Sequence, residues 1–254
     1  MTDVTTTRGS VGREEELALV EYHEGYAVLT INRAEKRNAM SSAAQKALCD
    51  ALENIKKAGS KAVVLTAAGD QSFCAGVDIK EKHDPTKRAF ANEASTWALT
   101  QKMITEHPAI FIAAVNGYAL GGGLTLVNSC DLAIAADTAT FGMPEIGFGQ
   151  YPALASPTTM RRILPKHAIW MTLTGQRIDA ATALRWGLVN EVVPRDRLLS
   201  RAIEVAMHVA QFDAIALDYS KKTYHIVSEL GWEAGIDYGL TVGPILASLK
   251  DVHR

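Results

Sequence analysis

The sequence is poor in the features that mark secreted, metal-binding and membrane proteins. Its three cysteines, Cys49, Cys74 and Cys130, are odd in number and lack CxxC spacing, which argues against a disulfide framework and a cysteine zinc site. The seven histidines form no HxH or HxxxH pair, so no metal site is expected. Residues 1–16 form a polar leader without the apolar segment of a secretory signal, and no later stretch approaches the roughly 18 apolar residues of a membrane span. A cytoplasmic protein is predicted.

Excess positive charge is also missing. The formal net charge is −2, which leaves no surplus of cations to follow a nucleic-acid backbone. With 48% hydrophobic and 21% charged residues, the 254-residue chain has an ordinary globular composition. We therefore expect one α/β domain with a terminal extension and a sizeable core.

The N-terminal part of the chain begins with a hairpin and a helix. Residues 17–22 and 26–32 flank a turn at Glu24-Gly25, which predicts two short strands paired as a hairpin. Ser42 and Gln45 have the spacing of a capping box, and apolar residues follow at helical spacing. Gly59 is expected to end this helix.

Three later segments have the pattern of strands buried on both faces. Residues 61–67, 110–115 and 132–136 are short, nearly continuous apolar runs, separated by loops and helical patterns. Such alternation predicts a ββα series with a parallel sheet and crossover connections. We assign residues 17–194 to this core. The helical patterns of residues 195–254 have too little internal core to stand alone, so they should pack on the sheet or on a neighbouring subunit.

Two glycine-containing turns follow two of these strands. CAGVD at residues 74–78 follows the strand at 61–67, and GGG at residues 121–123 follows the strand at 110–115. Glycine permits left-handed dihedrals and close approach of a ligand, and a helix that begins at Gly121 directs its positive end at that ligand. Two converging N–H groups would form an oxyanion hole. The structural alternative is that each glycine only relieves a tight turn.

Other glycine-loop and nucleophile chemistries lack their motifs. The GGG turn is not followed by the Lys-Ser/Thr pair of a P-loop, and no GxGxxG opens the first βα unit. No GxSxG nucleophile elbow occurs either. Nucleotide hydrolysis and serine-based acyl transfer are therefore disfavoured.

Three separated motifs resemble the crotonase (enoyl-CoA hydratase/isomerase) superfamily: SFCAGVDIKE, AAVNGYALGGGLTLVNSCDLAIAADTATFGMPEIGFG and LTGQRIDAATALRWGLVNEVVP. The resemblance implies repeated ββα units with a C-terminal helical trimerisation region. It implies that the N–H groups of Val77 and Gly122 form the oxyanion hole. It also implies a CoA and thioester channel lined by Ala75, Val77, Asp78, Ile79 and Lys80.

The resemblance also points to one carboxylate. Family hydratases carry two glutamates, whereas this chain has Thr125 at the first position and Glu145 at the second, 20 residues later. One carboxylate suits proton transfer between two carbons of a substrate, as in an isomerase. Feruloyl-CoA hydratase-lyases resemble this chain in having a small hydroxyl residue followed by glutamate, so hydration stays open.

Each of these side chains also has a purely structural interpretation. Glu145 is either the proton carrier, with a carboxyl pKa raised by an apolar channel, or a solvated residue in a Pro-Glu turn. Thr125 either binds a substrate hydroxyl or water, or satisfies a backbone carbonyl. Tyr151 either orients a polar acyl group or fills the pocket wall. Four basic residues are alternatives for contacting CoA phosphates or for solvated surface: Lys36, Arg37, Lys221 and Lys222.

The sequence thus predicts an enoyl-CoA isomerase or hydratase that works through a thioester enolate with a single catalytic glutamate, Glu145. Alternatives are an acyl-CoA hydrolase or hydratase-lyase on the same scaffold, and a catalytically silent acyl-CoA-binding or RNA-binding relative. No metal or cofactor is expected, because CoA enters as part of the substrate. The expected partners are the acyl-CoA substrate and identical subunits in a homotrimer or dimer of trimers, without nucleic acid or membrane.

Overall fold

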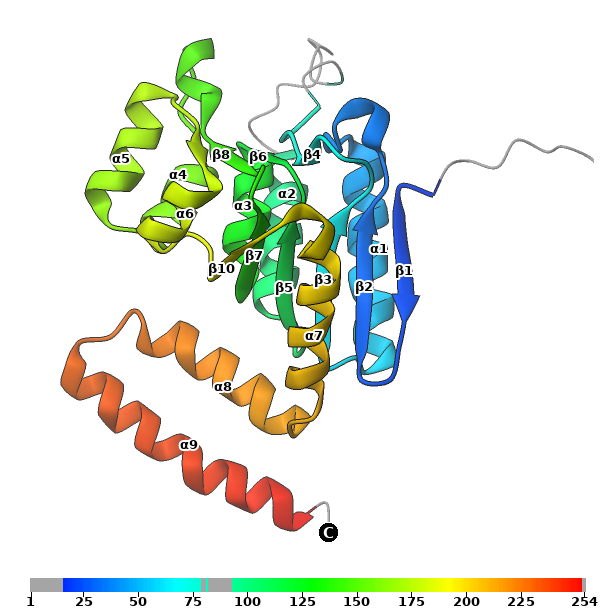
Figure 1. Ribbon diagram of the computed structural model, residues 1–254. Coiled ribbons are helices and arrows are strands. Elements are labelled where there is room, and N and C mark those ends of the chain that lie inside the picture. Colours follow the sequence, from blue (N-terminus) through cyan, green and yellow to red (C-terminus); the bar gives the residue numbers. More distant parts are fainter. Residues whose placement is uncertain (1–15, 79–80, 82–92, 253–254) are drawn as a thin grey trace, which may run out of the picture.

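The computed structural model describes residues 16–78, 81 and 93–252 and shows two sheets with helices around them (Figure 1). The larger sheet has the strand order β1-β2-β3-β5-β7-β10. Its strands are β1 (Ala18–Tyr22), β2 (Tyr26–Ile31), β3 (Ala62–Ala67), β5 (Ile110–Val115), β7 (Leu132–Ala136) and β10 (Glu191–Val193). The pair β1–β2 is antiparallel, as the predicted hairpin requires, and the other pairs are parallel.

The smaller sheet accounts for the repeat. Its strands, in the order β4-β6-β8-β9, are β4 (Ser72–Cys74), β6 (Tyr118–Leu120), β8 (Thr140–Gly142) and β9 (Ile178–Asp179). In each of the consecutive pairs β3/β4, β5/β6 and β7/β8, the first strand joins the larger sheet and the second joins the smaller one. This confirms the ββα architecture. None of the three-residue strands of this smaller sheet was predicted, because so short a segment carries no readable periodicity.

Helices surround the larger sheet on both faces. The α-helices are α1 (Ser42–Ala58), α2 (Glu93–Thr105), α3 (Gly122–Ser129), α4 (Ala155–Met160), α5 (Pro165–Thr174), α6 (Ala180–Trp186), α7 (Leu198–Ala210), α8 (Ala214–Val227) and α9 (Trp232–Val252). Short 3-10 turns are η1 (Ala34–Lys36), η3 (Pro144–Phe148) and η4 (Arg195–Arg197). Figure 1 shows α7 across one face of the larger sheet, with α1, α2 and α3 on the other.

The central strands are buried on both faces, as their apolar runs predict. In β3, Val63 and Leu65 belong to the core beneath α1, α2 and α3, whereas Val64 belongs to the core beneath α7. In β5, Phe111 and Ile112 divide between the two cores in the same way. Alternate residues of a strand point to opposite faces, so a sheet with helices on both sides needs apolar residues throughout.

The start of α1 differs from the prediction by one residue. The N-cap is Ser41, whose hydroxyl accepts a hydrogen bond from the backbone N–H of Ala44 at 3.2 Å. The capping box predicted for Ser42 and Gln45 is therefore wrong, and the buried Gln45 side chain lies one turn inside the helix. A run of two serines fits the capping pattern at either residue, and only tertiary packing fixes which one is used. Gly59 ends the helix with φ of 72°, as predicted.

The C-terminal helices divide into two parts. Helix α7 packs across the larger sheet, which confirms the expectation that the helical tail leans on the core. Helices α8 and α9 pack on each other and extend beyond the sheets (Figure 1). In the described part of the chain, no helix combines the length and apolar character needed to cross a bilayer.

His107, just before β5, is a buried histidine held in the neutral form. Its Nδ1 accepts a hydrogen bond from the backbone N–H of Ala109 at 3.0 Å, and its Nε2 lies 3.3 Å from the carbonyl oxygen of Leu52. Burial lowers the pKa of His107 from 6.5 to about 4, the hydrogen bond to Leu52 works against that shift, and the cation of Lys221 adds to it. Protonation of His107 at Nδ1 would place the new N–H of the ring against the backbone N–H of Ala109.

His107 should therefore make stability depend on pH. Between pH 6.5 and about 4, the unfolded chain binds a proton at this residue that the folded chain does not, so the free energy of unfolding should fall as the pH is lowered. The loss attributable to His107 is about 2–3 kcal/mol across this range. Urea unfolding at pH 7 and pH 4.5 checks this, with the non-titrating His107→Gln variant as control. Equal pH dependence in both proteins would contradict the assignment.

Candidate active site

The first predicted oxyanion donor, Val77, lies in a turn after β4. The backbone N–H of Met40 donates to Gly76 at 2.8 Å, and the N–H of Asp78 donates to Met40 at 3.0 Å. In a parallel bridge, the residue between these two groups directs its own N–H to the opposite side. The N–H of Val77 therefore points away from Met40. Gly76 makes the turn with φ of +94°, a conformation that favours glycine.

The second predicted donor, Gly122, is the first residue of α3. The first N–H groups of a helix have no acceptor within the helix, so no carbonyl of α3 accepts a hydrogen bond from the N–H of Gly122. Gly121 precedes it with φ of 52° and ψ of −115°, and its own N–H donates to Gly142 at 2.9 Å. A Cβ on Gly123 would lie 1.9 Å from the carbonyl oxygen of Cys74, so glycine lets α3 press against β4.

The two turns meet. A Cβ built on Gly76 would lie 3.3 Å from the backbone nitrogen of Gly122 and 3.0 Å from the carbonyl oxygen of Leu120. The turn that carries Val77 and the turn that carries Gly122 therefore lie so close together that a side chain at residue 76 would press on the second turn. The structure thus places the two turns named from the sequence next to each other.

Glu145 reaches the same place from η3. A Cβ on Gly121 would lie 2.6 Å from Oε1 of Glu145, so the carboxylate sits against the glycine turn beside Gly122. Its other oxygen, Oε2, is buried. The Gly121–Gly142 hydrogen bond ties the end of β8 to the turn and places η3, which begins two residues later, next to it. The carboxylate thus lies against the turn that leads into Gly122.

Thr125 lies one helical turn beyond Gly121 and is fully buried. Its hydroxyl donates to the carbonyl oxygen of Gly121 at 3.2 Å, and Ser129 donates to the carbonyl of Thr125 at 2.8 Å. The structure therefore shows the backbone-satisfying arrangement, which supports the shape of the glycine turn.

Asp78 and Ala75 hold the oxyanion turn in position. Asp78 forms an ion pair with Arg33 at 2.7 Å, and Arg33 also donates to the carbonyl of Ala39. The N–H of Ala75 donates to the carbonyl of Arg37 at 3.1 Å. Arg33 was missed by the sequence analysis, because no local pattern links residues 45 positions apart.

The remaining predicted residues are less informative. Ile79 and Lys80 lie outside the described residues. Tyr151 is 61% exposed, so its side chain is not part of an intramolecular pocket wall. Burial raises the pKa of the Cys74 thiol to about 12, against a weaker opposite effect of its contact with Gly76, so this thiol stays protonated at neutral pH and is no nucleophile.

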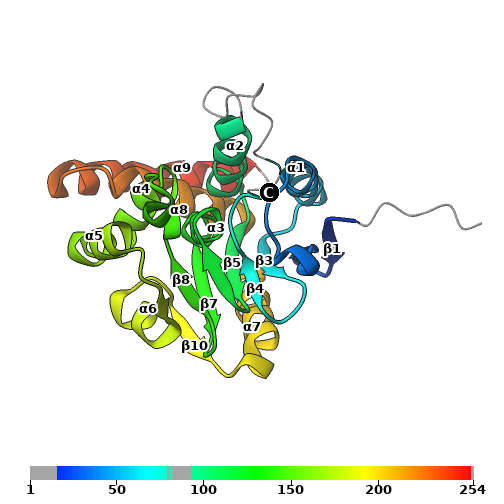
Figure 2. The same ribbon diagram turned by 90° about the horizontal axis from the view of Figure 1, so that it is seen from above.

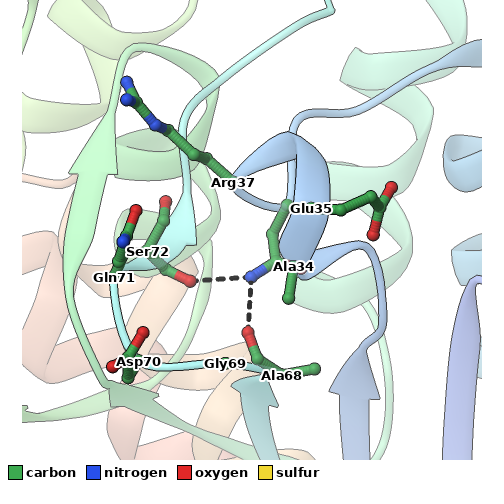
Figure 3. A pocket seen from close by; sticks show the side chains of 9 residues that line it. Ala34, Glu35, Arg37, Ala68, Gly69, Asp70, Gln71 and Ser72 are labelled. Carbon is green, nitrogen blue, oxygen red and sulfur yellow. Dashed lines mark hydrogen bonds between the residues drawn. The ribbon is translucent and has the colours of Figure 1, made fainter.

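A polar cavity of about 490 Å³ lies between η1 and residues 68–72 (Figure 3). Asn38, a second residue missed from the sequence, donates to the carbonyls of Ala68 at 2.9 Å and Ser72 at 2.7 Å. Arg37 lines this cavity, whereas Lys221 is buried in an ion pair with Asp131. The option that Lys221 contacts CoA phosphates is therefore wrong.

Enzymes that stabilise an oxyanion and transfer a proton use backbone N–H donors for the first task and a carboxylate for the second. The chain belongs to the enoyl-CoA hydratase/isomerase family, whose model matches residues 21–238. The match confirms the resemblance to the crotonase superfamily and makes the chain an acyl-CoA enzyme of the lyase/isomerase class.

Individual relatives agree with this assignment. The chain is 36% identical over 226 residues to a probable enoyl-CoA hydratase, echA8, of Mycobacterium bovis, covering 88% of this chain and 86% of that one. It is 33% identical over 227 residues to a hydroxycinnamoyl-CoA hydratase-lyase of Pseudomonas fluorescens, covering 86% and 82%. The crystal structure of an enoyl-CoA hydratase from Mycobacterium smegmatis superposes with a TM-score of 0.86 at 30% identity, covering 91% of each chain.

Proposed function

We propose that the enzyme binds an enoyl-CoA thioester with its carbonyl oxygen between the N–H groups of Val77 and Gly122, and that Glu145 transfers the proton beside the resulting enolate. The observation that carries this proposal is the closeness of three groups to one glycine turn: a Cβ on Gly76 would press on Gly122, and a Cβ on Gly121 would press on Glu145. Each group comes from a different ββα unit, so their meeting is not imposed by local sequence.

The chemical role of each group follows from its charge. As a proton leaves the carbon next to the thioester, negative charge develops on the carbonyl oxygen, and fixed N–H dipoles stabilise that charge without reorganisation. Loss of one such donor costs about 3–4 kcal/mol, or roughly a hundredfold or more in rate. Glu145 accepts the proton and returns it, which contributes about 10²–10⁴-fold. This scheme needs no metal or redox cofactor, because CoA arrives as part of the substrate.

The reaction could end as isomerisation or as hydration. With Glu145 as the single carboxylate, returning the proton to another carbon of the same acyl group gives an isomerase. The similarity to a hydroxycinnamoyl-CoA hydratase-lyase supports hydration instead, in which a water must be held opposite Glu145. The hydroxyl of Thr125 is committed to Gly121 as a donor, which leaves only its acceptor capacity for such a water.

The deciding experiment is a panel of CoA esters assayed in deuterated water with product analysis. Deuterium at the α or γ carbon without added oxygen identifies an isomerase, and a hydroxyacyl product identifies a hydratase. Free CoA without either product identifies a hydrolase, and an aldehyde with acetyl-CoA from a hydroxycinnamoyl ester identifies a hydratase-lyase. Tight acyl-CoA binding without turnover of any ester would contradict the proposal and favour a silent relative.

We further propose a homotrimer or pair of trimers in the cytoplasm. Helix α9 packs on α8 and leaves large apolar side chains in solvent, including Trp232, which is 80% exposed. Exposed apolar surface of this kind marks an interface, and a closed symmetric assembly would bury it. All three cysteines are free thiols, as a reducing compartment allows. Light scattering should give a multiple of three chains; a stable monomer at micromolar concentration would contradict this.

A further inference from the structure

Trp97 of α2 has a buried polar atom without an acceptor. The side chain is 3% exposed, and its Nε1 finds no hydrogen-bond partner among the residues that the structure describes. The indole N–H is a donor only, and in folded proteins a buried donor nearly always has an acceptor. Phenylalanine in this place would fill similar space without desolvating a polar atom. The N–H therefore needs an explanation.

The indole nitrogen lies beside Gly122, the second proposed oxyanion donor. A Cβ on Gly122 would lie 2.9 Å from Nε1 of Trp97, which puts the N–H of the indole beside the residue that donates to the thioester oxygen. Helices α2 and α3 are in contact and lie side by side in both views (Figures 1 and 2). Trp97 and Glu145 thus contact adjacent residues of the same turn, Gly122 and Gly121.

We propose that Nε1 of Trp97 donates a hydrogen bond to an oxygen on the acyl chain of the substrate, and that this bond selects acyl groups that carry a hydroxyl or carboxylate over plain hydrocarbon chains. This inference rests on the proposed function. The thioester oxygen already has the two backbone donors, so the indole serves a second acceptor. Because indole N–H does not ionise under these conditions, Trp97 positions the substrate and takes no part in proton transfer.

The selectivity depends on the hydrogen-bonding state of the Trp97 N–H before the ligand binds as well as in the complex. The N–H is already buried without an acceptor among the described residues of the free protein, so a hydrocarbon acyl chain leaves its state unchanged. An acyl oxygen removes the penalty of that unsatisfied donor, so the difference between the two ligands is larger than one exposed hydrogen bond would give. The same logic predicts that removing the N–H abolishes the preference and leaves hydrocarbon ligands unaffected.

The test compares binding of butyryl-CoA, 3-hydroxybutyryl-CoA and glutaryl-CoA to the protein with Trp97 intact and to its Trp97→Phe variant, both in the Glu145→Gln background to slow turnover. Trp97→Phe should weaken 3-hydroxybutyryl-CoA about 3–10-fold if the acceptor is a hydroxyl, or glutaryl-CoA about tenfold or more if it is a carboxylate. Butyryl-CoA should change less than twofold. Site-specific replacement of Trp97 by benzothienylalanine removes the N–H with the ring shape kept, and should reproduce the result.

The outcomes separate the two proposals. If Trp97→Phe and the benzothienylalanine protein weaken all three ligands equally, or weaken none, the assignment of the Trp97 N–H is overturned while the acyl-CoA site stands. If the protein with Trp97 intact does not bind butyryl-CoA at all, the proposed function fails, and this inference fails with it.

Discussion

Replacing Glu145 by glutamine is expected to lower turnover of the best acyl-CoA substrate by about 10²–10⁴-fold and to leave its affinity within a few-fold. Glutamine keeps the size and hydrogen-bonding capacity of the side chain that packs on Gly121, but it removes the exchangeable proton. Binding depends on the oxyanion donors and the acyl contacts, which the substitution leaves in place. Steady-state kinetics should therefore show the loss of turnover, while equilibrium binding of a substrate analogue should show nearly unchanged affinity.

The matched control is Thr125→Ala on the next helical turn. In an isomerase, it should cost less than tenfold, because the lost hydrogen bond to Gly121 is worth about 0.5–1.5 kcal/mol. In a hydratase whose water is held by Thr125, the cost should be larger, since a misplaced water adds to it. Turnover of Glu145→Gln within threefold of the parent enzyme would show that Glu145 is not the proton carrier.

Replacing Lys221 by methionine is expected to lower the free energy of unfolding by about 3–5 kcal/mol. The ammonium group of Lys221, on α8, is buried and lies 2.8 Å from Asp131, and it donates to the carbonyls of Ile104 and Ala109 at 2.9 and 3.0 Å. Methionine retains the length of the side chain but removes the cation that pairs with Asp131 and donates to the two carbonyls. Urea unfolding at pH 7 measures the change.

Lys222 supplies the control from the next position. It pairs with Asp218 at 2.6 Å one turn earlier in α8, but its side chain is exposed, so Lys222→Met should change stability by less than about 1 kcal/mol. Equal losses in the free energy of unfolding would show that the Lys221–Asp131 pair contributes no more than an exposed ion pair. A large effect of Lys221→Met alone would show that this buried pair anchors the C-terminal helices to the core.

Features that depend on local sequence were predictable, whereas features that depend on contacts between distant residues were not. The strands at β3, β5 and β7 were predictable because burial on both faces demands continuous apolar residues. The second strands of each unit were not, because three residues carry no period. The N-cap residue of α1 was also missed, because Ser41 and Ser42 both fit the capping pattern and only packing of the helix selects Ser41.

By itself, the sequence determined which groups are chemically able to act: glycines that expose the N–H groups of Val77 and Gly122, and the carboxylate of Glu145. Tertiary structure decided which partners those groups meet. It placed Glu145 against Gly121, engaged Asp78 with Arg33 and Thr125 with Gly121, and left the indole N–H of Trp97 without an acceptor beside Gly122 among the residues that the structure describes. The reason is physical: backbone conformation and side-chain chemistry are local properties of residue type, whereas contacts between ββα units exist only once the sheets and helices have packed.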